Sequence, residues 1–323
     1  MPTILRKTKG KKFHYTDKKG KAITDKDVLE YLKKLKTPPN YSNVKIYYPV
    51  NSHKLLYSGI DTAGRQQCIY SPKWKKRAKK NYFCDLITFG RLLPKITSQI
   101  NSLLQNKKTT KNKQIAIILK IISICHFRVG NQRYENLYQS HGIATIQKQH
   151  IKIDTTNKTF HIEFVGKKAV LNYCMIQDSK LYNCILHLLK DRKKPTDYIF
   201  TYYEKNQLQR IKASDINNWL KKFDKSFSSK MFRTFSTNIL LIDRMKQQNP
   251  KTLTLNKRKK AIVQFMKEVS GLVHNTPCIC RKDYANQDLI KLYIEHPRKW
   301  NNKFANSTSR TGFVNFLAEQ CKS

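Results

Sequence analysis

Residues 114–130 read QIAIILKIISICHFRVG. Apolar side chains fill almost every position from Ile115 to Phe127, so the helix that this stretch predicts is expected to be buried on nearly all sides. Arg128 follows at its end, next to Gly130. A buried cation is costly unless it is paired. Arg128 is therefore expected either to cap the carbonyl groups of this helix or to bind an anion.

Outward from this stretch, apolar residues recur with helical spacing from about residue 85 onward. The segments expected as helices are 85–105, 114–127, 178–190, 214–223, 232–246, 257–273 and 286–295. Alternating patterns predict strands at 143–153, 159–165 and 168–174. These patterns predict a larger, mainly helical domain with a small three-stranded sheet, over residues 85–323.

The first 84 residues have a different pattern. They contain a basic arm at 1–12, an amphipathic helix at 24–36, strands at 43–50, 54–60 and 65–71, and a charged stretch at 73–80. A small β-rich domain is therefore expected over residues 1–84, and the fold class of the whole chain is α+β.

The charge balance indicates a polyanionic partner. The 323 residues include 64 Lys and Arg against 21 Asp and Glu, which gives a formal net charge of +43. An aromatic fraction of 11% argues against disorder, and the longest apolar runs are far shorter than the roughly 20 residues that a membrane span needs. The eight Cys form no C-x-x-C pair, so reduced thiols in an intracellular protein are expected.

Two kinds of chemistry are disfavoured by missing motifs. The chain has no G-x-x-x-x-G-K-[ST] loop, which argues against ATP hydrolysis. It has few acids and no obvious carboxylate cluster, which argues against a two-metal nuclease. Any chemistry on DNA would then come from cations, hydroxyls and amides, with no metal and no cofactor.

Besides Arg128, three sites carry residues suited to such chemistry. Lys167 lies in a Gly-Lys turn between two expected strands, where a solvated surface lysine is the plain alternative. Arg233 lies near the start of a helix, where a salt bridge would be the default although acids are scarce. Asn275 follows His274 ahead of Pro277, and Tyr284 precedes a further helix.

The order of Arg128, Lys167, Arg233, Asn275 and Tyr284 resembles the catalytic set of the poxvirus-like type IB DNA topoisomerases. Residues 57–70, with Gly59, Asp61, Gly64, Arg65, Gln67 and Tyr70, also resemble that family's N-terminal G-x-D-x-x-G-R-x-Q-x-x-Y segment. Phe13-His14-Tyr15, Pro38-Pro39 and Phe89-Gly90-Arg91-Leu92-Leu93-Pro94 resemble the branch found in bacteria and some large DNA viruses. The resemblance covers roughly residues 10–300.

The resemblance implies a monomer that clamps double-stranded DNA and relaxes it without ATP. Tyr284 would cut one strand through a 3′-phosphotyrosyl link, Arg128 and Arg233 would stabilise the charge on the phosphate, and Lys167 would protonate the leaving 5′-oxygen. Asn275 stands where poxviral members have histidine, and a shift of one residue that uses His274 instead stays open. An AT-rich codon signature permits a large DNA virus as the source.

The same resemblance implies contacts to the DNA backbone. The residues assigned to them are Lys230, Tyr134, Tyr70, Lys73 and Arg77, with Lys75 and Lys76 beside the last two. For each of these, a solvated basic surface is the alternative.

Two other functions remain open from the sequence. Tyrosine site-specific recombinases share the chemistry but usually carry H-x-x-R at the second arginine, where this chain has Lys230-Met231-Phe232-Arg233. A non-enzymatic basic DNA-packaging protein would fit the charge but not the ordered set of residues.

Overall fold

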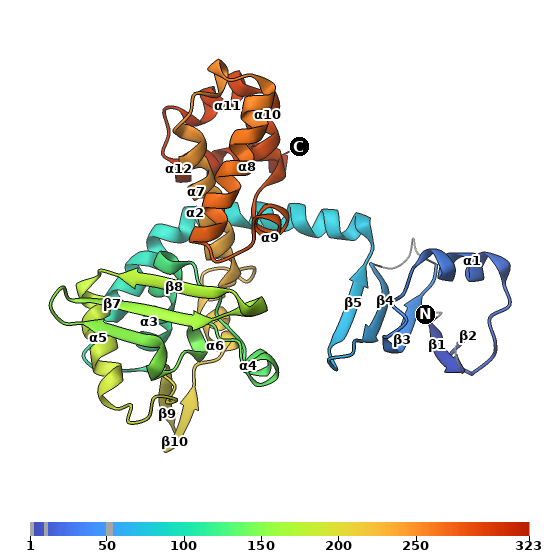
Figure 1. The fold of residues 1–323 in the computed structure, drawn as a ribbon, viewed down its shortest axis with the longest axis horizontal. Helices are drawn as coiled ribbons and strands as arrows, with labels where there is room; N and C mark the ends of the chain where they lie inside the picture. Colours follow the sequence, from blue (N-terminus) through green and yellow to red (C-terminus); the bar gives the residue numbers. More distant parts are fainter. Residues whose placement is uncertain (1–2, 10–11, 50–53, 323) are drawn as a thin grey trace. The chain divides into compact units, whose positions relative to one another are not determined.

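The computed structural model describes residues 3–9, 12–49 and 54–322, apart from the side chains of residues 9, 133 and 134. The chain divides into two compact units, Met1–Tyr82 and Phe83–Ser323. The first is rich in strands and the second is mainly helical (Figure 1), which confirms the expected α+β class.

The first unit is built on an antiparallel sheet with the strand order β2-β1-β3-β4-β5. Its elements are β1 (Thr3–Lys9), β2 (Lys12–Thr16), α1 (Lys26–Lys34), β3 (Ser42–Tyr47), β4 (Leu55–Ile60) and β5 (Gln66–Tyr70). The helix begins where Asp25 accepts hydrogen bonds from the backbone N–H groups of Asp27 and Val28. The hydrophobic core of this unit includes Ile4, Val44 and Ile46 from the sheet and Leu32 from the helix.

The expected basic arm at the N-terminus is wrong for the residues that the structure describes there. They form β1 and β2, and β1 is an inner strand of the sheet, paired to both β2 and β3. Arg6 is only 8% exposed on β1. Its guanidinium donates to the backbone carbonyl groups of Pro38, at 2.9 Å, and Tyr41, at 2.5 Å. Backbone carbonyl groups therefore satisfy the buried guanidinium of Arg6. The charge of this residue alone predicted an exposed position.

The helix expected at 85–105 begins much earlier, because α2 runs from Pro72 to Gln105. Pro72 occupies the first turn, where its missing N–H costs nothing, and Ser71 Oγ accepts from the backbone N–H of Trp74 at 3.2 Å. The charged stretch that follows consists mostly of Lys and Arg, which are good helix formers. The stretch 73–80 is therefore helical.

The second unit contains the elements that follow α2. They are α3 (Lys111–Cys125), α4 (Gln132–Tyr138), β6 (Ile151–Asp154), β7 (Thr159–Val165), β8 (Leu171–Ile176), α5 (Ser179–Lys190), β9 (Thr201–Glu204), β10 (Gln207–Arg210), α6 (Ala213–Leu220), α7 (Lys230–Lys246), α8 (Leu255–Leu272), α9 (Pro277–Ile279), α10 (Gln287–Glu295), α11 (Pro297–Phe304) and α12 (Ser309–Lys322). The three-stranded sheet expected near residue 160 is confirmed as β6-β7-β8, with antiparallel pairing. The first of its expected strands, 143–153, is wrong over most of its length, because Ile143–Thr145 and Lys148–His150 form 3-10 turns and only Ile151–Asp154 pairs as a strand. The pattern did not predict α4, α9, α11, α12 or the β9–β10 hairpin.

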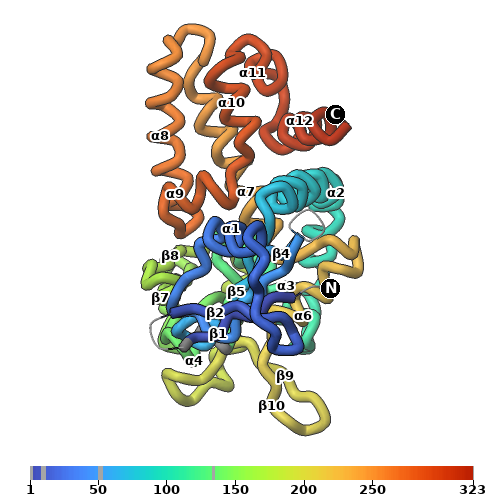
Figure 2. Tube along the Cα trace, turned by 90° about the vertical axis from the view of Figure 1, so that its right-hand side faces the viewer, coloured from blue at the N-terminus to red at the C-terminus, as the bar shows by residue number. Residues whose placement is uncertain are grey.

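The core of the second unit is centred on α3, whose residues from Ile115 to Ile122 are at most 2% exposed apart from Lys120. The helix contacts β8 on one side and α6 and α7 on the others. Farther along the chain, α8, α10 and α11 lie side by side (Figures 1 and 2), and α12 returns to contact both α11 and α7. No helix among the described residues is both long and apolar enough to cross a membrane.

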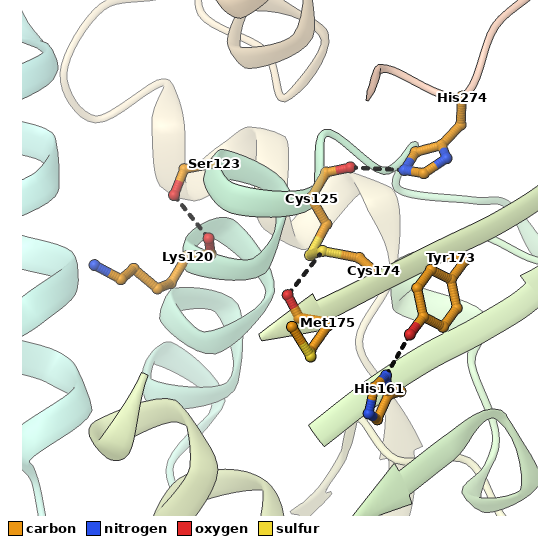
Figure 3. Close-up of a disulfide and its surroundings, with 8 residues drawn as sticks. All are labelled: Lys120, Ser123, Cys125, His161, Tyr173, Cys174, Met175 and His274. Carbon is orange, nitrogen blue, oxygen red and sulfur yellow. Dashed lines mark hydrogen bonds between the residues drawn. A yellow bond between two sulfur atoms is a disulfide. The ribbon is translucent and has the colours of Figure 1, made fainter. Parts of the chain in front are cut away.

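The expectation of eight reduced thiols is wrong for four of them. Disulfides join Cys84 to Cys321 and Cys125 to Cys174. The partners are 237 and 49 residues apart in the chain, so only the tertiary fold brings them together and no sequence motif marks them. The second disulfide joins the end of α3 to β8 (Figure 3).

Candidate active site

The backbone fixes Arg128 directly after the buried helix. His126 turns the chain out of α3 with a left-handed φ of 55°. The carbonyl oxygen of Arg128 then accepts from the backbone N–H of Ile143 at 2.9 Å. Gly130 lies so close to Gly142 that a Cβ atom on it would come within 2.8 Å of the Gly142 backbone. The arginine thus lies on a segment held from both sides, and only glycine permits this approach.

Arg233 is buried with two donors unused. It lies in the first turn of α7, is 3% exposed, and donates from Nη2 to the carbonyl oxygen of Val273 at 2.7 Å. Its Nε and Nη1 atoms are buried without a hydrogen-bond partner among the described residues. Burial lowers the pKa of the guanidinium to about 10, so the group is charged at neutral pH. The expected default of a salt bridge is not what holds it, and its unused donors suit an anion.

Asn275 meets Arg128 at the end of α8. Arg128 donates from Nη2 to Oδ1 of Asn275 at 2.5 Å, while Nδ2 of Asn275 is buried without a partner among the described residues. Asn275 is thus a hydrogen-bond partner of the Arg128 side chain. The capping alternative would instead have placed the Arg128 side chain on the carbonyl groups of α3. The amide leaves one donor that could face a ligand.

The chain reaches Asn275 through a left-handed turn. The backbone N–H of His274 donates to the carbonyl oxygen of Gly271, and the backbone N–H of Asn275 donates to the carbonyl oxygen of Ser270. These two bonds are the pattern of a Schellman motif. His274 has a φ of 49°. Its Nε2 atom lies 3.1 Å from the carbonyl oxygen of Cys125 (Figure 3). The imidazole is thus engaged by the end of α3.

Tyr284 ends a π-helical turn, Cys280–Tyr284, in which the backbone N–H of Ala285 bonds to the carbonyl oxygen of Cys280. The side chain is 8% exposed. The guanidinium carbon of Arg233 lies 5.4 Å from its ring centroid, and Nζ of Lys230 lies 5.7 Å from it. Burial by itself would raise the pKa of the phenol, but the charges of Arg233 and Arg128 outweigh it and hold that pKa below 10.0. The surroundings favour the phenolate, which is the nucleophilic form.

Asn238, which the sequence analysis missed, fixes the backbone around Tyr284. It is fully buried on α7, five residues after Arg233. Its Nδ2 donates to the carbonyl oxygen of Tyr284 at 3.0 Å, and its Oδ1 accepts from the backbone N–H of Asn286 at 2.8 Å. One sequence signal could have indicated this role. Asn238 lies in line with Thr234 and Leu241 on the apolar face of the helix, and a buried amide requires hydrogen-bond partners.

Lys167 differs from these residues because it is exposed. It lies in the turn between β7 and β8, as expected. The turn is closed by a bond from the backbone N–H of Gly166 to the carbonyl oxygen of Val170, at 2.8 Å. The Asn172 side chain donates to the same carbonyl at 2.8 Å. The turn is therefore held by two hydrogen bonds to one carbonyl group, and Lys167 is exposed on it.

Of the residues expected to contact DNA, Lys230 lies beside Tyr284, as described above. In the first unit, Tyr70 stacks on Trp74 with ring centroids 4.4 Å apart. Lys73 and Arg77 are exposed on the first turns of α2. Tyr134 belongs to α4, but its side chain lies outside the described residues.

Comparison with known proteins identifies the family. Residues 71–306 match the family model of the eukaryotic DNA topoisomerase I catalytic core, and residues 12–61 match that of the bacterial DNA topoisomerase IB N-terminal domain. DNA topoisomerase 1B of Acanthamoeba polyphaga mimivirus is 27% identical over 303 residues, which are 92% of this chain and 89% of the relative. DNA topoisomerase 1B of vaccinia virus (strain Copenhagen) is 24% identical over 317 residues, 93% of this chain and 94% of the relative.

The matched regions contain every residue of the site described above except Tyr70, which lies between them. The first family model begins just before α2 and ends beyond Tyr284, so it covers Arg128, Arg233 and Asn275 as well. Both relatives match along nearly their whole length. The chain therefore belongs to the DNA topoisomerase I family and is a type IB topoisomerase.

Proposed function

We propose that this enzyme relaxes supercoiled DNA by cutting one strand through a covalent bond to Tyr284. The observation that carries the proposal is a set of unused donors on Arg233, which lies over the Tyr284 ring, and on Asn275, which bonds to Arg128: Nε and Nη1 of Arg233 and Nδ2 of Asn275 are buried without partners among the described residues. Unpaired buried donors are costly, and a phosphate group would satisfy them. The site is thus suited to a DNA phosphodiester next to a tyrosine nucleophile.

In the proposed cleavage step, the Tyr284 oxygen attacks the phosphorus atom. A bond forms between this oxygen and the 3′-phosphate, the bond to the 5′-oxygen of the next nucleotide breaks, and the strand downstream leaves as a 5′-hydroxyl. Arg128, Arg233 and Asn275 donate hydrogen bonds to the non-bridging oxygens, where negative charge increases in the transition state. The guanidinium charges near Tyr284 also keep its pKa below the ordinary value, which favours the attacking form.

We assign the general acid to Lys167, which would protonate the leaving 5′-oxygen. It is exposed at the end of the β7–β8 hairpin, so it can approach a bound strand. Once the strand is cut, torsion in the duplex drives rotation about the intact strand. The 5′-hydroxyl then attacks the phosphotyrosine and restores the DNA. The energy of the broken bond stays in the phosphotyrosine, so the cycle uses neither ATP nor a metal ion.

Binding of the duplex is assigned to the positive charge outside this site. Residues 1–84 are proposed to form the DNA-clamp domain and residues 85–323 the catalytic domain of a monomer. Tyr70, Lys73, Arg77, Tyr134 and Lys230 contact the backbone in this proposal. Neutralising about 6–10 phosphates would give a slope of log affinity against log salt of about −5 to −9. The DNA substrate and the viral relatives support an intracellular, viral setting.

The test of the proposed function is relaxation of a negatively supercoiled plasmid in EDTA without ATP. The wild-type protein is expected to relax the plasmid and to form a covalent complex with the 3′ end of the cut strand after denaturation. Tyr284→Phe is expected to do neither, while Tyr293→Phe, on α10, serves as the matched control. Unchanged relaxation by Tyr284→Phe would show that another residue is the nucleophile.

The role of Lys167 has a separate test. Lys167→Ala is expected to slow cleavage about 10²- to 10⁴-fold on ordinary DNA. A substrate whose leaving group is a 5′-thiol needs no proton, so on this substrate the variant is expected to cleave nearly as fast as the wild type. Lys168→Ala, the next residue in the same turn, is the control. Equal slowing on both substrates would exclude Lys167 as the acid.

A further inference from the structure

His274 occupies a backbone position that suits glycine. It is the left-handed residue of the Schellman motif that ends α8, with a φ of 49°. A residue with a Cβ atom is disfavoured in the left-handed conformation, and glycine is the usual residue at this position of the motif. A histidine at such a position indicates that its side chain contributes something that glycine could not.

The side chain of His274 contacts the segment that leads to Arg128. Its Nε2 atom lies 3.1 Å from the carbonyl oxygen of Cys125, one of the last carbonyl groups of α3 (Figure 3). A carbonyl only accepts, so Nε2 carries the proton and donates. The imidazole also lies against the ring of Phe127, with the centroids 5.0 Å apart. Both contacts fall within three residues of Arg128.

The two neighbours of His274 engage the two arginines of the site. The carbonyl oxygen of Val273 accepts from Arg233, and Oδ1 of Asn275 accepts from Arg128. Three consecutive residues therefore connect the end of α8 to other parts of the site. Val273 bonds to Arg233 on α7, His274 to the end of α3, and Asn275 to Arg128. His274 is the only one of the three whose side chain holds the α3 segment without touching an arginine in the contacts that the structure describes.

Phe127 extends this arrangement to the hairpin of Lys167. Its ring is fully buried between His274 and Phe164, with centroids 5.0 Å from each. Phe164 lies on β7, three residues before Lys167. The disulfide of Cys125 to Cys174 joins the same end of α3 to β8. The segment before Arg128 is therefore a junction between the hairpin and the end of α8.

We infer that His274 is a positioning residue that holds Arg128 against Asn275 by clamping the end of α3 to the end of α8. The inference rests on the proposed function, because the pair that it positions is assigned to the scissile phosphate. It also answers the alternative that the sequence left open. The Nε2 donor of His274 is directed at a backbone carbonyl, so the residue acts through Arg128 and Asn275 and does not bind the phosphate itself.

The test compares His274→Gly and His274→Gln in single-turnover cleavage and in DNA binding. Glycine relieves the left-handed backbone but removes the clamp, so cleavage is expected to slow about 10- to 100-fold with the dissociation constant for DNA within about twofold of the wild-type value. Glutamine carries an Nε2 donor at a similar reach, so it is expected to restore cleavage to within about threefold of the wild type. Asn206→Gly, at an exposed left-handed turn with a φ of 62°, is the matched control and is expected to cleave normally.

Three results would overturn the inference. Wild-type cleavage by His274→Gly would show that the side chain is not needed. A glutamine variant as slow as the glycine variant would show that the donor is not what matters. Weaker DNA binding with an unchanged cleavage rate would make His274 a DNA contact instead.

A second measurement separates this inference from the proposed function. In protein labelled with ¹⁵N-histidine, the His274 ring is expected to be the Nε2–H tautomer, with a proton that exchanges slowly with water and a signal that is lost in His274→Gly. This spectrum needs no DNA and no activity. A wild-type protein that never forms a covalent complex would refute the proposed function while the spectrum still reports on the clamp, and a fast-exchanging or Nδ1–H ring would refute the clamp alone.

Discussion

The carboxamide of Asn238 bonds to the backbone on both sides of Ala285, accepting from Asn286 N–H and donating to the carbonyl oxygen of Tyr284 at 3.0 Å. The same helix carries Arg233, whose guanidinium lies over the Tyr284 ring. One helix thus fixes both the tyrosine and a cation that lowers its pKa. The proposed nucleophile is therefore placed by the hydrogen bonds of a buried amide.

Asn238→Ala is expected to slow DNA cleavage about 10²-fold, because a small shift of a reacting group is enough for such a loss. It should also lower the free energy of unfolding by about 1–3 kcal/mol, since two buried backbone groups lose their partner. Single-turnover cleavage and urea unfolding measure the two effects. Ser236→Ala, on the same helix, is the control and should change neither. A variant that cleaves at the wild-type rate would mean that the π-helical turn holds Tyr284 unaided.

Arg233→Lys tests whether the forked shape of the guanidinium matters beyond its charge. Lysine keeps the charge but offers a single flexible ammonium in place of donors in a fixed plane. Cleavage is expected to slow about 10²- to 10³-fold, the usual loss for one preorganised donor. Arg244→Lys, farther along α7 and paired with Glu268, is the control. A loss below about threefold at Arg233 would show that charge alone suffices.

The pH dependence of cleavage tests the electrostatics of Tyr284. Burial raises the pKa of its phenol, but the charges of Arg233 and Arg128 outweigh this effect and the pKa lies below 10.0. The single-turnover rate is therefore expected to rise with pH, with the midpoint of the rise below pH 10. In Arg128→Gln one of the two charges is lost, so the midpoint of the rise should move to higher pH. If the midpoint of the pH–rate curve is the same in Arg128→Gln and in the wild type, the rise comes from the titration of a group other than Tyr284.

Much of the site followed from the order of residues along the chain. Arg128, Lys167, Arg233, Asn275 and Tyr284 were predicted as one set. All but Lys167, which is exposed on the β7–β8 turn, converge in the structure although up to 156 positions separate them in the sequence. Periodicity predicted α3 as a core helix because its apolar side chains leave no polar face. Such predictions succeed where one strong local pattern determines the outcome.

Other features depend on tertiary contacts that no local pattern contains. The placement of Arg6 inside the first sheet depends on carbonyl groups more than 30 residues away. The role of Asn238 depends on the backbone of Tyr284, 46 residues farther along the chain. The π-helical turn that carries Tyr284 is not marked by hydrophobic periodicity or by a turn motif. The short helices α11 and α12 are rich in polar residues and are held by the packing of Trp300, Phe304 and Phe316.

The Cys84–Cys321 disulfide predicts a redox-dependent stability. It closes a loop of 237 residues and joins α2 to α12. A native disulfide typically contributes about 2–4 kcal/mol, so Cys84→Ser with Cys321→Ser should lower the melting temperature, and reductant should lower that of the wild type. Cys278→Ser, at an exposed free thiol, is the control. A wild-type melting curve that is the same with and without reductant would contradict the prediction.

Buried neutral histidines predict a loss of stability in mild acid. Burial lowers the pKa of His150 to about 4, with a further contribution from His141, and Nδ1 of His150 accepts from the backbone N–H of Gln147 at 2.9 Å. An unfolded histidine titrates near 6.5. Between these values the unfolded chain binds a proton that the folded chain excludes, so the free energy of unfolding falls as the pH is lowered from about 6.5 toward 4. His126 and His274, whose pKa values burial also lowers to about 4, act in the same direction.

Each such histidine contributes up to about 1.4 kcal/mol per pH unit in this window. The free energy of unfolding, measured with urea at pH 7, 6 and 5, should therefore decline less steeply in His150→Gln than in the wild type. The difference in slope corresponds to the uptake of up to one proton on unfolding. The carboxylate of Glu135 opposes this effect, because its charge raises the pKa of His150. His187→Gln, exposed on α5, is the matched control. Parallel declines for the wild type and His150→Gln would show that His150 is protonated in the folded protein despite its bond to Gln147.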